Sequence, residues 1–94
     1  MLNRQKAMRK LIETYGKEAQ KDVAIEECAE LTKAILKERR YGQTIESREN
    51  IIGEIADVKN MIGQLILIYN CEKEVQDYAE LKLIRQLERI ENHE

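Results

Sequence analysis

Hydrophobic positions recur every three or four residues along most of the chain, which is the spacing of an amphipathic helix. The alternating pattern of a half-buried strand is absent. The spacing predicts four helices with short links between them. The expected segments are residues 2–15, a start between residues 18 and 22 running to about residue 41, a third helix to about residue 69, and a fourth to about residue 90.

The breaks between these segments carry the residues that usually end or begin helices. Gly16 and Gly42 stand just after two predicted helix ends, where glycine is favoured. Thr44 or Ser47 is a candidate cap for the third helix, and Asn70 marks the break before the fourth. With 94 residues and no proline, the chain is predicted to form one all-α domain over residues 1–94, built as a compact antiparallel four-helix bundle.

One helix places a carboxylate inside its apolar face. With Val23 taken as zero and ~100° per residue, Leu31 falls near ~80° and Glu27 near ~40°, inside the apolar arc. Glu30, near ~340°, lies at the edge of this arc, whereas Glu26, near ~300°, lies on the solvated side. The three glutamates of the stretch EECAE are therefore not equivalent.

The third predicted helix repeats this feature. Glu54 and Asp57 lie among Met61, Leu65 and Ile68 on its helical projection, and their spacing of three residues places them side by side. Glu27 and Glu30 have the same spacing. Two helices thus each offer an acidic pair to the interior.

Converging carboxylates repel one another unless a positive group compensates. Oxygen ligands without His or Cys suit Mg²⁺ or Mn²⁺ better than zinc. We therefore expect a site for a divalent cation held by Glu27, Glu30, Glu54 and Asp57. The alternative is that these acids are partly exposed boundary residues paired with Lys or Arg.

Charge and cysteine content exclude several functions. The net charge of −2 gives no basic footprint for a nucleic-acid polymer. No apolar run is long enough for a membrane span, and the charged N-terminus is unlike a signal peptide. We expect a cytoplasmic protein with reduced thiols, in which Cys28 packs in the core.

The ordered pair EECAE (residues 26–30) and EIAD (residues 54–57) resembles the EExxE…ExxD pattern of the all-α, MazG-like nucleoside triphosphate pyrophosphohydrolases. The resemblance spans residues 15–89 and is nearest to short, single-domain phage or bacterial members. It implies magnesium-dependent cleavage of (deoxy)nucleoside triphosphates to a monophosphate and pyrophosphate. The same four carboxylates would be the metal ligands. Glu26 and Glu27 would be catalytic, Glu26 by orienting water or a ligand from outside the first coordination sphere.

The resemblance also implies basic contacts to phosphate from a later helix. Lys82, Arg85 and Arg89 lie within a ~60° arc of the fourth helix and fit this role. Asn60 flanks the metal face and is a weaker substrate-binding candidate. The alternative for the cations is a solvated basic stripe. Where many relatives have a lysine and an acid near the second motif, this chain has Asn50 and Gly53.

Three functions stay open at this point: a pyrophosphohydrolase, a non-catalytic regulator that binds nucleotide or metal, and a helical interaction module. Ile25, Ala29 and Leu36 form a second apolar stripe on the second helix, away from Glu27. The third helix is also apolar beyond its acidic face. These stripes, together with the resemblance, predict a homodimer or homotetramer. The alternative is a monomer in which the first helix covers the stripe.

Overall fold

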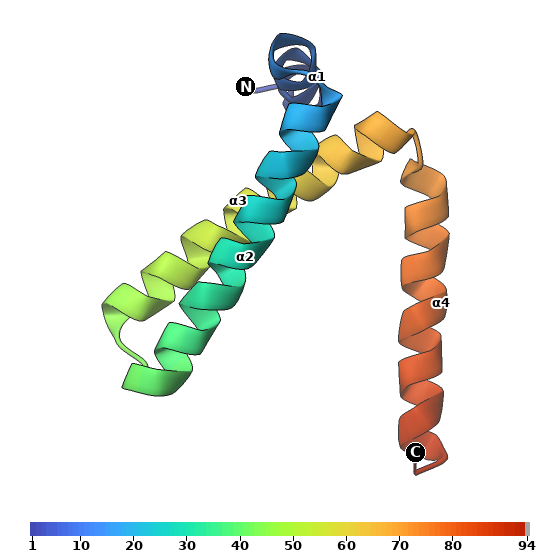
Figure 1. Cartoon of the computed structure of the whole chain (residues 1–94). Coiled ribbons are helices and arrows are strands. Elements are labelled where there is room, and N and C mark those ends of the chain that lie inside the picture. The colour runs from blue at the N-terminus through green and yellow to red at the C-terminus, as the bar shows by residue number, and fades with distance from the viewer. Residues whose placement is uncertain (94) are drawn as a thin grey trace.

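The computed structural model describes residues 1–93, which form four α-helices and no strand (Figure 1). The predicted all-α class is therefore confirmed. The helices are α1 (Arg4–Tyr15), α2 (Lys17–Tyr41), α3 (Ile45–Tyr69) and α4 (Glu72–Glu91).

The first two helices are separated by a single residue. Gly16 has φ 93° and ψ 152°, and its N–H donates to the carbonyl of Ile12. Because only glycine adopts such a positive φ without strain, α1 ends here and a new helix begins immediately. α2 therefore starts at Lys17, before the predicted window of residues 18–22.

The link between α2 and α3 uses both predicted capping residues. The backbone N–H of Ser47 donates to Thr44 Oγ1 at 2.9 Å, and the backbone N–H of Thr44 donates to Ser47 Oγ at 2.8 Å. This reciprocal pair satisfies donors that the helix itself leaves unpaired. At the other end of α3, Asn70 takes the left-handed conformation, with φ 49° and ψ 52°, and ends the helix.

Helices α2 and α3 form an antiparallel hairpin, and α1 packs across its open end (Figure 1). Helix α4 contacts only α3 and runs away from the other helices beyond the turn at Cys71. The compact four-helix bundle expected from the sequence is therefore not formed within one chain. Within residues 1–93, α1, α2 and α3 pack together, and α4 contacts α3 alone.

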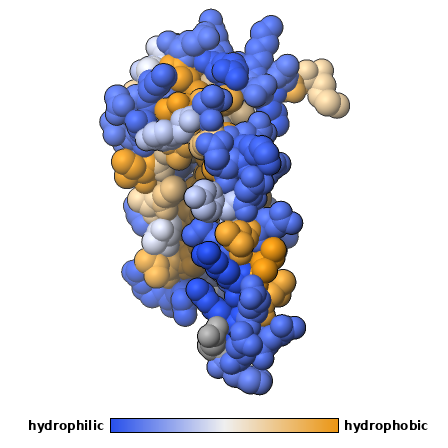
Figure 2. Space-filling model, turned by 90° about the vertical axis from the view of Figure 1, so that its right-hand side faces the viewer, coloured by the Kyte–Doolittle hydropathy of each residue, from blue (hydrophilic) through white to orange (hydrophobic). Residues whose placement is uncertain are grey.

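The buried core of this arrangement is small. Ala24, Ala34 and Met61 are its only buried apolar residues among those described. On α4, Leu83, Leu87 and Ile90 are 62%, 64% and 72% exposed. Figure 2 shows such hydrophobic side chains, in orange, interrupting the hydrophilic surface on the face that carries α4.

Within the described part of the chain, none of the helices combines the length and the apolar character needed to cross a membrane.

Candidate metal centre

A buried hydrogen bond joins α2 to α3. Gln20 Nε2 donates to Gln64 Oε1 at 2.6 Å, and both side chains are buried. Seven residues further toward the hairpin loop, α2 carries Glu27 and α3 carries Asp57. Because seven residues are close to two full helical turns, the register that pairs the glutamines also brings these two carboxylates face to face.

Three of the four predicted ligands come together at this place. Glu27, Glu54 and Asp57 each offer a carboxylate oxygen, and the three oxygens lie within 4.8 Å of one another. Glu27 and Glu54 are half-buried, whereas Asp57 is exposed. Oxygen ligands of a single Mg²⁺ lie about 3–4 Å apart, because each is about 2.1 Å from the ion. The observed spacing is close to that of a ligand set.

Burial and the neighbouring carboxylates both disfavour the charged form of Glu27. Removal from water raises the pKa of Glu27 above its ordinary value of 4.5, and interaction with Asp57 raises this pKa further. The charges of Glu54 and Glu30 add smaller increases. Glu54 Oε2 is buried without any hydrogen-bond partner in the described chain. A cation bound here would supply the missing partner and oppose the repulsion.

Ion pairs do not account for the three convergent acids. Among residues 1–93, the observed salt bridges join Lys21 to Glu18, Lys33 to Glu30 and Lys73 to Asp77. None of these involves Glu27, Glu54 or Asp57. The alternative of boundary acids paired with Lys or Arg therefore does not describe this cluster.

The fourth predicted ligand lies beside the cluster and not within it. Glu30 is exposed, and its carboxylate is 3.7 Å from Lys33 Nζ on the next turn of α2. Its charge still contributes to the raised pKa of Glu27. Its position at the edge of the apolar arc explains why a neighbouring lysine reaches it.

The two other candidates, Glu26 and Asn60, are not part of the carboxylate cluster. Glu26 is exposed on α2, as expected for a residue on the solvated side. The side-chain oxygen of Asn60 accepts a hydrogen bond from the Arg4 guanidinium on α1. Asn60 therefore ties α1 to α3 and is already engaged. This contact joins residues far apart in sequence, which the helical pattern alone does not reveal.

The predicted phosphate-binding cations lie elsewhere. Lys82, Arg85 and Arg89 are all exposed on α4. Since α4 does not contact α2 and runs away from α3 beyond the turn at Cys71 (Figure 1), a single chain does not bring these residues to the carboxylates.

Cys28 is exposed, so the prediction that it packs in the core is wrong for a single chain. Ile35, seven residues further along the same side of α2, is exposed as well. Within residues 1–93, α4 does not contact α2.

The structure also shows a groove that the sequence pattern did not reveal. It begins at Glu30 and Glu54 and runs toward the hairpin loop, with Lys33, Lys37 and Arg40 along it. The spacing of these three cations along α2 was a usable signal, because residues at i, i+4 and i+7 share one helix face. Their proximity to the second acidic motif depends on the pairing of α2 with α3.

Comparison with known proteins finds no family model that matches the chain and no significant match among curated proteins or solved structures.

Proposed function

We propose that the chain is a divalent-metal-dependent hydrolase that converts (deoxy)nucleoside triphosphates to the monophosphate and pyrophosphate. One observation carries the proposal. Three carboxylates from two helices converge to within 4.8 Å, and one of them keeps a buried oxygen without a partner. The order of the motifs EECAE and EIAD, similar to that of the MazG-like enzymes, supports the choice of reaction.

The donor set fits a hard cation. Only carboxylate oxygens converge at this place, which favours Mg²⁺, with Mn²⁺ as a substitute. Glu27, Glu54 and Asp57 would hold the ion, and Glu30 would join them by leaving Lys33. When bound, the ion would polarise a phosphoryl oxygen and lower the pKa of a bound water.

The chain's own residues would hold and orient the reactants. The half-buried Glu27 and Glu54 lie on facing helices of the α2–α3 hairpin and would hold the acidic centre together. Glu26, exposed one position before Glu27, would orient the attacking water. Basic side chains would stabilise the charge that develops on the departing pyrophosphate.

We further propose that the active form is a homodimer or a homotetramer. Helix α4 leaves its apolar side chains exposed, and a second copy of the chain would cover them. In such an assembly, Lys82, Arg85 and Arg89 from one copy would approach the nucleotide bound by another. These three cations would then contact the nucleotide at the acidic site of a neighbouring copy and not at the site of their own chain.

Pyrophosphate release from a panel of ribo- and deoxyribonucleoside triphosphates with Mg²⁺ tests the proposed reaction. Glu54→Gln and Asp57→Asn should each lower turnover by about a hundredfold or more, because each removes a ligand charge at nearly constant shape. Circular dichroism should show that both variants keep their helices.

One control and one comparison between neighbouring glutamates make this test specific. Glu80→Gln, a change at an exposed acid on α4, should leave turnover within about twofold. Glu26→Gln should be milder than Glu27→Gln. Turnover within tenfold of wild type for both ligand variants would refute the site. Stabilisation by Mg²⁺ without turnover would identify a regulatory binding protein, and the absence of both effects a helical interaction module.

A further inference from the structure

A groove adjoins the carboxylate cluster, and most of the residues that line it lie outside the two acidic motifs. Its volume is about 390 Å³, and it lies between the second half of α2 and the first half of α3. Glu30 and Glu54 form the end nearest the cluster. From α2, Lys33, Lys37 and Arg40 line the groove together with the apolar side chains of Ala34 and Leu36 and with Tyr41.

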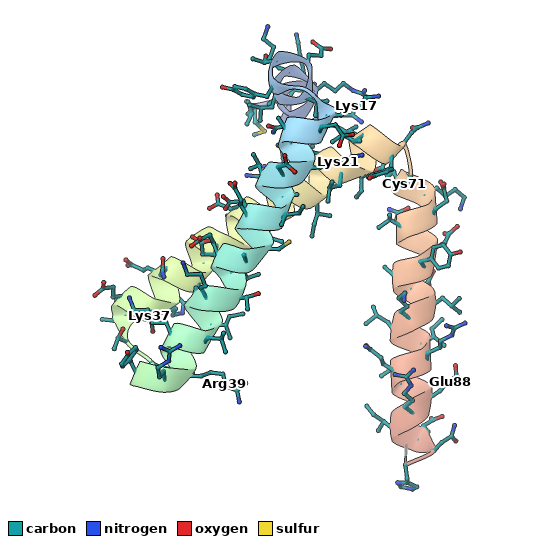
Figure 3. The ribbon with its side chains drawn as sticks, in the orientation of Figure 1. Lys17, Lys21, Lys37, Arg39, Cys71 and Glu88 are labelled. Carbon is teal, nitrogen blue, oxygen red and sulfur yellow. The ribbon has the colours of Figure 1, made fainter. Side chains whose placement is uncertain are left out.

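The helix geometry explains this lining. Residues 33, 37 and 40 share one face of α2, while Asn50 lies one turn before Glu54 on α3 and lines the same groove. Ala34 is buried between the two helices, so its small side chain leaves room above it. Figure 3 shows Lys37 on the side of α2 next to α3, whereas Arg39 projects away from the hairpin.

The groove is negative at one end and positive at the other. Lys33 already pairs with Glu30 at 3.7 Å. Within residues 1–93, neither Lys37 nor Arg40 forms a salt bridge. The Arg40 guanidinium carbon lies 5.7 Å from the centroid of the Tyr41 ring, a cation–π contact that restrains this side chain. Two cations at the loop end are therefore available to an anion.

A polyphosphate carrying a divalent cation has the complementary arrangement of charge. Its metal end fits the carboxylates, and its free phosphate end fits lysine and arginine. A nucleic-acid strand is a poorer fit, because the groove ends against Glu30 and Glu54. An uncharged ligand would leave Lys37 and Arg40 without a partner.

We propose that the phosphate chain of the substrate lies in this groove, with its metal-bearing end at Glu54 and its terminal phosphates on Lys37 and Arg40. This inference rests on the proposed hydrolase function, since it places the leaving pyrophosphate of that reaction. The Asn50 amide donates to a phosphate oxygen, and Lys33 exchanges Glu30 for the phosphate. The groove is therefore the primary phosphate site and is formed by one chain.

Inorganic tripolyphosphate with Mg²⁺ is the probe, and calorimetry measures its binding to the full chain. The double variant Lys37→Gln/Arg40→Gln should weaken this binding about tenfold or more, because two charge-assisted hydrogen bonds are lost. It should also lower kcat/KM for a triphosphate substrate by about tenfold or more, because both cations hold the departing pyrophosphate. Arg39→Gln is the matched control and should change binding by less than about twofold, because Arg39 faces away from the groove.

A companion variant, Lys82→Gln/Arg85→Gln, tests whether α4 supplies these contacts instead. Tripolyphosphate binding within about twofold of wild type for Lys37→Gln/Arg40→Gln overturns the groove assignment, whichever result the α4 variant gives. The groove assignment is also overturned if Lys37→Gln/Arg40→Gln and Arg39→Gln weaken tripolyphosphate binding equally, because equal losses would indicate only a general charge effect.

The outcomes separate this inference from the proposed function. Binding that depends on Lys37 and Arg40, without turnover of any triphosphate, supports the groove and refutes the hydrolase. Pyrophosphate release that is unaffected by the double variant supports the hydrolase and refutes the groove. A wild-type chain that neither binds tripolyphosphate nor releases pyrophosphate refutes both.

Discussion

Glu27 lies on the interior side of α2, where three other carboxylates influence its ionisation. Loss of hydration and the nearby Asp57 both oppose its negative charge, so its pKa lies above 4.5. At neutral pH the metal-free fold therefore carries a repulsion that a bound cation would remove. Arrangements of this kind are more typical of ligand sites than of structural ion pairs.

The raised pKa predicts how the stability of the metal-free protein depends on pH. The contribution of Glu27 to stability is fully present below pH 4.5, where the group is protonated in both states. It is lost as the pH rises through the raised value of the folded state. Glu27→Gln has no proton to lose at this position, so it should be more stable than wild type above that value.

Urea unfolding in EDTA from pH 4 to pH 8 measures this effect. The midpoints of wild type and Glu27→Gln should be similar at pH 4 and should separate as the pH rises. Adding Mg²⁺ at pH 8 should stabilise wild type more than the variant. A wild type that is the more stable of the two in EDTA at pH 8 would contradict the repulsion inferred at Glu27.

At the scale of elements, the α2–α3 hairpin supports the whole site. Its contact surface uses small buried residues, Ala24 and Ala34, and one buried amide pair, Gln20 and Gln64. Small side chains let the helices approach closely, but they specify the register weakly. A buried polar pair can specify it, because any shift of one helix would leave an amide without its partner.

The buried amide pair yields a double-mutant prediction. Gln64→Leu alone leaves Gln20 buried and unpaired, and should lower the free energy of unfolding by about 1–3 kcal/mol. Gln20→Leu combined with Gln64→Leu removes both polar groups and should cost less than the single change. Mg²⁺ should nevertheless bind the double variant more weakly than wild type, because the register that aligns Glu27 with Asp57 is less well fixed.

Denaturant unfolding of both single variants and the double variant measures the coupling between the two glutamines, and a Mg²⁺ titration measures the effect on the site. Additive losses of stability would show that the two amides act independently. Unchanged Mg²⁺ binding by the double variant would show that other contacts set the register.

At the scale of the molecule, the isolated chain is too extended for a compact domain. Its radius of gyration is 16.5 Å, whereas a compact chain of this length has about 12 Å. Its accessible surface is 8076 Å², against about 5,700 Å² expected for a folded monomer of this mass. The difference, about 2,400 Å², exceeds the roughly 800 Å² that each partner buries in a standard interface.

A chain with this much uncovered surface should associate with itself. Light scattering during size-exclusion chromatography should give at least twice the 11.1 kDa mass of one chain at micromolar concentration. Leu87→Glu on α4 and Ile25→Glu on α2 each place a charge on an exposed apolar residue and should weaken the assembly. Activity should fall with association, since α4 cations would act on a neighbouring copy.

Thr14→Glu adds the same charge on the exposed face of α1 and serves as the control. It should leave the mass unchanged. A mass of one chain for the wild type would contradict the assembly. It would also exclude contacts between α4 and the acidic site of another copy.

The sequence by itself determined the four helices, most of their ends and the half-buried position of Glu27 and Glu54, whereas Asp57, expected among apolar neighbours, is exposed. These features depend on local hydrogen bonds, capping side chains and periodicity, which residues close in sequence decide. The start of α2 at Lys17 is a local feature that was missed, because Gly16 both ends one helix and precedes the next.

Only the tertiary structure decided which of these residues meet. The alignment of Glu27 with Asp57, the use of Asn60 by Arg4, the groove beside Glu54 and the separation of α4 all depend on contacts between distant segments. A helical projection gives the direction of a side chain around its own axis but not the register or the partner of that helix. By setting that register, the fold brings carboxylates of two separate acidic motifs together in one cluster.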